Sequence, residues 1–93
     1  MSTSTPIEEQ GADEAAFTDG EFRERLRDLP PSAKLIAKVL ETDAPLSQGR
    51  LAEESLLPDR TVRYALNRLE ESDLVGSRYS FHDARKQVYY LSR

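Results

Sequence analysis

Four polar side chains, spaced three and four residues apart, form the most informative pattern in this sequence. They are Arg60, Arg63, Tyr64 and Asn67, and on a helix this spacing places them on one face. Arginine can donate two parallel hydrogen bonds to O6 and N7 of guanine, and asparagine can pair similarly with N6 and N7 of adenine. Hydroxyl groups such as those of Tyr64 and Thr61 can bind phosphate. The pattern predicts a helix that reads base edges, although a merely solvated helix face would carry the same residues.

A second basic cluster lies within residues 76–86, where Arg78, Arg85 and Lys86 outnumber the single acid Asp83. An arginine at a hairpin tip can enter a narrow minor groove, where the potential of DNA is most negative. Asp83 can hold such an arginine in position through a charge-assisted hydrogen bond. The alternative interpretation is an ordinary hairpin turn with solvated charges.

The element that positions the first cluster is predicted by helical periodicity. Its apolar residues recur at i, i+3, i+4 and i+7, a stripe that faces inward when the arginines face outward. Asp59 precedes the stripe and is the expected N-cap of a helix over residues 59–72. The stripe consists of Val62, Ala65, Leu66 and Leu69.

A change of period after Asp73 predicts the element that positions the second cluster. Residues 74–81 and 86–92 are rich in β-branched and aromatic side chains, as strands prefer. The polar residues 82–85 between them read as a turn, so the two segments form a hairpin.

Three further helices are expected upstream. A short helix over residues 18–29, capped by Asp19, ends at two prolines, and a clearer helix runs from Pro31-Ser32 to about Thr42. Pro45-Leu46 can form a very short strand. Ser47 is then expected to cap a helix over residues 48–55. Leu51 and Ala52 of this helix are expected to face the core. Leu56 and Leu57 are both expected to be buried in the following turn.

The resulting fold class is α+β, a winged helix-turn-helix with a three-helix core and a β-hairpin wing. Residues 17–93 are expected to form this domain. Residues 1–16 are rich in Ser, Thr and Glu and are expected to be a disordered acidic tail, because they offer too little apolar surface to offset the entropy of ordering.

The segment SQGRLAEESLLPDRTVRYALNRLEESDLV, residues 47–75, resembles the helix-turn-helix of MarR-type regulators. The triplet Asp83-Ala84-Arg85 resembles the Asp-x-Arg wing motif of that family, and the similarity covers about residues 31–92. Related patterns occur in ArsR-like and archaeal winged-helix proteins. The matching positions are Leu51-Ala52, Thr61-Val62, Leu66, Leu69-Glu70 and Leu74-Val75.

The resemblance implies a sequence-specific regulator of transcription that binds double-stranded DNA. Residues 59–72 would lie in the major groove and wing residues 76–92 on the minor groove or backbone. A winged helix that binds another protein of a transcription or assembly complex is the alternative, and it is favoured if Glu54, Glu70 and Glu71 interrupt the positive surface. The expected DNA-binding residues are Ser47, Gln48, Arg60, Thr61, Arg63, Tyr64, Asn67, Arg68, Arg78, Asp83, Arg85 and Lys86.

MarR-type regulators usually dimerise through long terminal helices, whereas this sequence stops within two residues of its last expected strand. A homodimer would therefore form through residues 17–41. Phe17, Phe22 and Leu26 are the candidate contacts, unless they pack on their own domain. A small-molecule effector is not expected, because the family binds such ligands beside its dimerisation helices.

Composition excludes several classes of protein. The chain has no cysteine and one histidine, which leaves neither a disulfide framework nor an ordinary zinc site, and we expect no cofactor. It shows no signal peptide, no apolar run of membrane-spanning length and no catalytic motif, so we expect a cytoplasmic protein that is not an enzyme.

Charge is distributed unevenly along the chain. The net charge is −4, yet residues 1–29 hold eight acids and three arginines, whereas residues 30–93 hold ten basic and nine acidic residues. Ten arginines against three lysines, together with many acids, resemble the composition of proteins from salt-loving archaea. The alternative is an ordinary acidic protein with an acidic tail.

Overall fold

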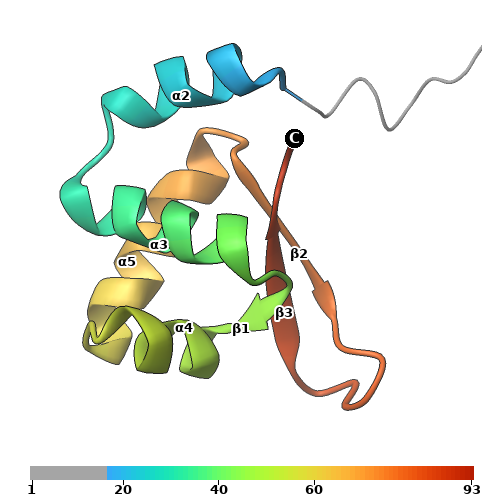
Figure 1. Ribbon diagram of the computed structural model, residues 1–93. Coiled ribbons are helices and arrows are strands. Elements are labelled where there is room, and N and C mark those ends of the chain that lie inside the picture. Colours follow the sequence, from blue (N-terminus) through green and yellow to red (C-terminus); the bar gives the residue numbers. More distant parts are fainter. Residues whose placement is uncertain (1–16) are drawn as a thin grey trace, which may run out of the picture.

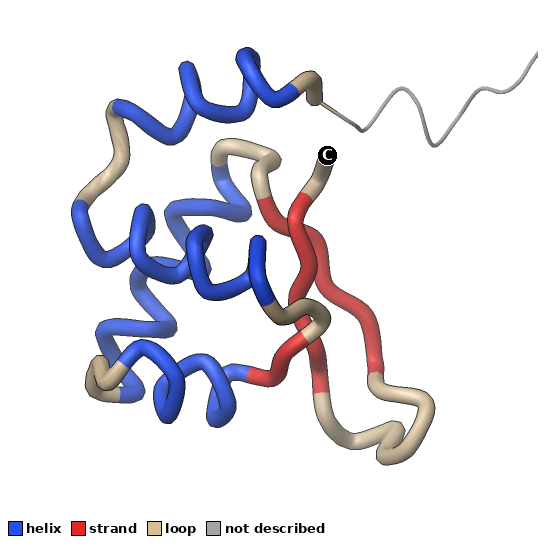
Figure 2. Tube along the Cα trace, viewed as in Figure 1, coloured by secondary structure: helices blue, strands red, loops and turns tan. Residues whose placement is uncertain are grey.

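A computed structural model describes residues 17–93, so the expected tail over residues 1–16 lies outside the described residues. The helices gather on one side of a three-stranded antiparallel sheet with strand order β1-β3-β2 (Figures 1 and 2). This confirms the expected fold class. The elements are α2 (Asp19–Arg27), α3 (Pro31–Thr42), β1 (Leu46–Ser47), α4 (Gln48–Ser55), α5 (Asp59–Glu71), β2 (Val75–Tyr79) and β3 (Gln87–Leu91).

Helix α5 supplies the centre of the core. Each of its four stripe residues is at most 2% exposed, so the periodicity prediction is confirmed. Four residues of α3 pack in the same cluster, together with Leu51 of α4 and Leu74 after α5. Because these contacts fix α5 from several sides, its outward face is held in one orientation. The α3 residues are Ala33, Ile36, Ala37 and Leu40.

The caps of two helices differ from the expected ones. Thr18, not Asp19, caps α2: its hydroxyl oxygen accepts from Glu21 N at 3.1 Å, while Glu21 Oε1 accepts from Thr18 N at 3.0 Å. This reciprocal capping box places Asp19 inside the first turn. Pro58, not Asp59, is the N-cap of α5, so Asp59 is already helical and its carboxylate makes no capping bond.

The turn between α4 and α5 corrects a second expectation. Leu56 is 88% exposed, because it closes α4 in the left-handed conformation, with φ 62°, and its side chain points away from the core. Leu57 is partly buried and packs against the core as expected. Ser47 caps α4 as predicted, its hydroxyl oxygen accepting from Arg50 N at 3.2 Å.

The hairpin strands are shorter than expected, because residues 80–86 form a separate tip. Ser80 N donates to Lys86 O at 2.8 Å, which closes the tip where the regular ladder ends. The strands pair from Val75 with Leu91 to Tyr79 with Gln87. Gly76 lies beneath the ring of Tyr90, and a Cβ there would approach that ring to 2.7 Å, so any other residue would displace it.

Helix α2 packs on its own domain. Phe22 is 3% exposed within the core cluster, and Phe17 and Leu26 pack partly buried against it. Of the two alternatives for Phe22, a dimer contact or packing on its own domain, the structure supports the second, because its ring contacts the core of its own chain. None of the helices within residues 17–93 is long and apolar enough to cross a membrane.

Candidate nucleic-acid interface

The exposed face of α5 carries the first predicted cluster. Arg60, Arg63, Tyr64 and Asn67 are all exposed, whereas Thr61 and Arg68 are partly buried. The face exists because the four stripe residues occupy the opposite side of the helix. The structure therefore brings the predicted base-reading side chains together on one anchored surface.

The side chains on this face differ in how they are engaged. Arg68 donates from Nη1 to the hydroxyl oxygen of Tyr64 at 3.0 Å and lies 3.8 Å from a carboxylate oxygen of Glu71. Within residues 17–93, the side chains of Arg60, Arg63 and Asn67 make no hydrogen bond or ion pair. Their donors are therefore available to a partner, whereas those of Arg68 are partly engaged.

A shallow hollow of about 320 Å³ connects the helix-turn-helix to the wing. Ser47 and Gln48 from the start of α4 face Lys86 and Gln87 of the hairpin across it. Gln48 Nε2 donates to the carbonyl oxygen of Asp59 at 3.4 Å, which links the hollow to α5. The first turn of α4 and the Lys86 ammonium group both attract negative charge, so the hollow suits a phosphate group.

The wing tip shows the predicted contact between Asp83 and Arg85. One carboxylate oxygen of Asp83 accepts from the backbone N of Arg85 at 3.0 Å and from its Nε at 3.3 Å. These bonds hold the pKa of Asp83 below its ordinary value, the backbone bond contributing most and the side-chain bond next. The side chain of Arg85 remains 91% exposed, so Asp83 orients it without covering it.

Comparison with known proteins agrees with this geometry. Residues 33–75 match a protein family described as winged helix-turn-helix DNA-binding. None of the curated proteins compared with this sequence matches it.

The chain has the winged helix-turn-helix fold.

Solved structures of MarR-type regulators share the fold of this winged-helix domain. The MepR–DNA complex of S. aureus superposes with a TM-score of 0.64 at 20% identity, covering 77% of this chain and 61% of that one. The zinc-responsive MarR family member ZitR of Lactococcus lactis superposes with a TM-score of 0.62 at 25% identity, covering 69% of this chain and 44% of that one. BpsR of Bordetella bronchiseptica superposes with a TM-score of 0.67 at 19% identity, covering 77% of this chain and 53% of that one. These matches confirm the MarR-type resemblance, and the chain spans about half the length of each structure.

The charge of the winged-helix domain is mixed where α5 meets the wing. The pKa of Tyr89 on β3 is raised, chiefly by burial and then by the charge of Glu70, while Arg63 acts in the opposite direction. Glu70 therefore lies near the basic face of α5 that carries Arg63. Two other acids are paired: Glu54 lies 2.9 Å from Arg50, and Glu71 contacts Arg68. Of the three acids expected to interrupt the surface, Glu70 is the one without an ion pair within residues 17–93.

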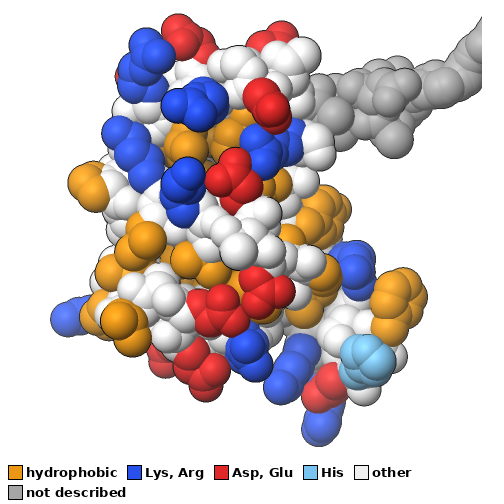
Figure 3. Space-filling view, viewed as in Figure 1, with side chains coloured by type: hydrophobic (Ala, Val, Ile, Leu, Met, Phe, Trp, Pro, Cys, Tyr) orange, Lys and Arg blue, Asp and Glu red, His pale blue; other side chains and the backbone are white. Residues whose placement is uncertain are grey.

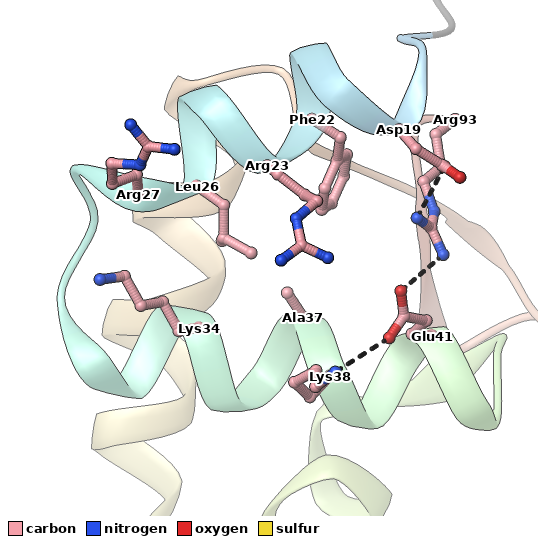
Figure 4. A pocket seen from close by; sticks show the side chains of 10 residues that line it. All are labelled: Asp19, Phe22, Arg23, Leu26, Arg27, Lys34, Ala37, Lys38, Glu41 and Arg93. Atoms are coloured by element: carbon pink, nitrogen blue, oxygen red, sulfur yellow. Dashed lines mark hydrogen bonds and ion pairs between the residues drawn. The ribbon is translucent and has the colours of Figure 1, made fainter.

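A second basic surface, a groove of about 500 Å³ between α2 and α3, was not expected. Figure 4 shows Phe22, Leu26 and Ala37 at its base, and Figure 3 shows basic side chains around an apolar patch over these helices. Glu41 closes one end, where it accepts from Arg93 at 2.8 Å and from Lys38 at 3.5 Å. Arg93 also contacts Asp19 at 2.9 Å.

The two basic helix faces that border this groove could have been predicted from the sequence. Arg23 and Arg27 are four residues apart, as are Lys34 and Lys38, so each pair occupies one face of its helix. Periodicity cannot show that the two faces meet, because that depends on how α2 packs against α3.

Proposed function

We propose that this winged-helix domain is a sequence-specific, double-stranded DNA-binding regulator of transcription. Helix α5 lies in the major groove and the wing contacts the adjacent minor groove or backbone. The observation that carries the proposal is the exposed face of Arg60, Arg63 and Asn67, whose side chains are unpaired within residues 17–93 and whose helix is fixed by a fully buried stripe.

Two further observations support this assignment. The matched family is described as DNA-binding, and one structural neighbour, MepR, was solved in a complex with DNA. The hollow that contains Gln48 and Lys86 lies between the helix-turn-helix and the wing, so one phosphate there would bridge the two contact regions.

A homodimer through residues 17–41 would place two recognition helices on half-sites about one helical turn apart. Phe22 is buried, so the contact would use side chains that remain exposed. Leu35 of α3, 40% exposed, is the largest apolar side chain of this kind in that range. Sedimentation of the free protein and of its DNA complex measures the stoichiometry directly.

The decisive experiment is fluorescence anisotropy with a labelled genomic fragment from upstream of the protein's own gene. It compares the wild type with Arg60→Ala/Arg63→Ala/Arg85→Ala at several salt concentrations, including molar potassium chloride. A matched control, Arg23→Ala/Arg27→Ala/Lys34→Ala, removes the same number of positive charges from the α2–α3 groove. We expect the first variant to lose binding and the control to retain it.

Two results would contradict the proposal. Equal losses in both variants would show that binding follows net charge and not the α5 face. Absence of binding by the wild type at every salt concentration, with this fragment and with a random-sequence library, would favour the protein-binding alternative. The mixed charge near Glu70 is the feature that such a partner would use.

The α2–α3 groove favours a second candidate function, regulation by a small amphipathic anion, although the sequence predicted no effector. Its volume falls within the range of ligand sites, and a basic rim surrounds an apolar base. For BpsR, one of the structural neighbours, regulation of DNA binding by 6-hydroxynicotinic acid is described. Benzoate is a suitable probe: chemical-shift changes at Leu26 and Ala37, abolished by Arg23→Ala/Lys34→Ala, would support the site, and unchanged spectra would exclude it.

A further inference from the structure

The wing tip exposes an aromatic ring that does not pack against the core of the described chain. Phe81 is 90% exposed, more than any other large apolar side chain within residues 17–93. Three large side chains of β3 instead pack within the domain: Tyr89 and Leu91 pack against the core, and Tyr90 covers Gly76. A folding role therefore does not account for a phenylalanine at this position.

The tip is held in a defined conformation around Phe81. Ser80 N donates to Lys86 O at 2.8 Å, and Ser80 Oγ accepts from His82 N at 3.1 Å. Lys86 N donates to Asp83 O at 2.9 Å. These bonds fix the backbone on both sides of Phe81, so the loop holds this residue at the wing tip with its ring exposed to solvent.

The surroundings of the ring are basic. The guanidinium carbon of Arg78 lies 5.0 Å from the centre of the Phe81 ring, and Arg85 and Lys86 follow in the same tip. Within residues 17–93, Arg78 and Lys86 form no ion pair, and the carboxylate of Asp83 pairs with Arg85. A flat apolar ring beside unpaired cations matches a polyanion with apolar faces, as nucleic acids present in their sugars and stacked bases.

We propose that Phe81 is an apolar wedge that enters the minor groove beside the site read by α5, partly unstacks one base step and bends the duplex. Arg78 lies against the ring and neutralises the phosphates that the bend brings closer. The proposal rests on the DNA-binding function proposed above and adds to it a specific contact and a change of DNA shape. It also implies a preference for pyrimidine–purine steps, which unstack most easily, at a position without base-specific hydrogen bonds.

The test uses the full chain and a duplex selected from a random library by the wild-type protein. Terminal fluorophores report bending by energy transfer, and 2-aminopurine at each step beside the α5 half-site reports unstacking. The variants are Phe81→Ala, Phe81→Leu, which keeps an apolar wedge, and Leu56→Ala, an exposed apolar control in the turn between α4 and α5. Circular dichroism and thermal unfolding establish that each variant is folded.

We expect Phe81→Ala to weaken binding by about tenfold and to abolish both the bend and the 2-aminopurine signal. Phe81→Leu keeps most of both signals, and Leu56→Ala resembles the wild type. Unchanged affinity and bend in Phe81→Ala would overturn the wedge, as would weakened binding with an unaltered bend.

The two proposals fail in distinguishable ways. If the wild type binds DNA, the Arg60→Ala/Arg63→Ala/Arg85→Ala variant does not, and Phe81→Ala behaves like the wild type, the wedge alone is wrong. If the wild type selects no duplex from the library, both proposals are wrong.

Discussion

Helices α2 and α5 each carry three arginines, but they use them differently. On α5, Arg60 and Arg63 make no side-chain hydrogen bond or ion pair within residues 17–93. On α2, Arg25 lies 4.4 Å from the centre of the Phe17 ring and donates to Ser72 O at 3.4 Å, and Arg27 lies 3.6 Å from Glu24. Arg25 and Arg27 thus contact groups of their own domain, whereas Arg60 and Arg63 make no such contact within residues 17–93.

The two helices also differ in how firmly they are anchored. Helix α5 buries four side chains, whereas α2 buries only Phe22. A surface that reads DNA needs both unpaired hydrogen-bond donors and a fixed orientation. Any side-chain or backbone motion that must be lost on binding lowers the affinity. The number of arginines therefore does not distinguish the two helices, whereas the partners of those arginines and the burial beneath them favour α5 as the proposed interface.

The largest expected effect comes from removing the anchor of α5. Leu69→Ala should lower the free energy of unfolding by about 2–5 kcal/mol, because it leaves a cavity in the centre of the core. Phe22→Ala should chiefly detach α2, leaving the α5 amides protected and DNA affinity unchanged. Urea denaturation, native-state hydrogen exchange and anisotropy measure the three quantities.

If Phe22→Ala destabilised the whole domain as much as Leu69→Ala, the contrast in anchoring would be wrong. Loss of hydrogen-exchange protection in α5 as well as α2 would lead to the same conclusion.

A smaller effect should distinguish base readers from backbone contacts. Asn67→Ala should relax specificity at one base pair by about 1–3 kcal/mol, whereas Lys86→Ala should weaken binding to all sequences alike. Arg25→Ala on α2 serves as the control and should leave both affinity and specificity unchanged. The measurement is competition with single-substitution duplexes. Equal losses by Asn67→Ala on selected and scrambled DNA would refute its role as a base reader.

The smallest expected effect concerns two acids, one in each basic region. The pKa of Glu41 in the α2–α3 groove is lowered chiefly by the charge of Lys38, with Arg93 contributing next, whereas that of Asp83 is lowered chiefly by a backbone hydrogen bond. Salt screens charges between exposed groups more than it weakens a short hydrogen bond. NMR titration at about 0.01 M and about 1 M salt should therefore raise the pKa of Glu41 more than that of Asp83.

The sign of the pH dependence is the same for both acids. Each has a folded-state pKa below its ordinary value, so each contact contributes fully above the ordinary pKa and is lost as the pH falls through the folded-state pKa. The Asp83–Arg85 contact should accordingly persist at neutral pH and weaken only in acid. A Glu41 pKa that salt does not move would show that hydrogen bonds, and not charge, dominate there.

The elements and most of their bounds were predictable from local pattern. The stripe from Val62 to Leu69 and the change of period after Asp73 predicted α5 and the hairpin, because helix and strand repeats depend on neighbouring residues alone. The errors also arose locally: Thr18 and Pro58, not the adjacent aspartates, occupy the cap positions. At α2, Thr18 and Asp19 are both cap-forming residues, and spacing did not distinguish between them. At α5, Pro58 occupies the cap position without a side-chain capping bond, so no cap-forming side chain marked it.

The candidate site was predictable in composition but not in assembly. The sequence indicated Gln48, Arg63 and Lys86 as binding residues, yet it gave no reason to expect a hollow joining α4 to the wing. Nor did it predict the exposure of Leu56, because an apolar residue in a turn reads as core until its backbone conformation is known. Phe81 was assigned to a strand because aromatic residues favour strands, whereas β2 ends at Tyr79.

The sequence by itself determined which face of each helix is apolar, where the chain turns and which side chains α5 presents, since these follow from the repeat of a helix or a strand. Only the tertiary structure decided which faces meet. The groove between α2 and α3, and the ion pair that joins Arg93 to Asp19 across 74 positions of sequence, arise from packing that brings distant segments together. Local periodicity carries no information on such pairings, because they depend on how the whole core fits around α5.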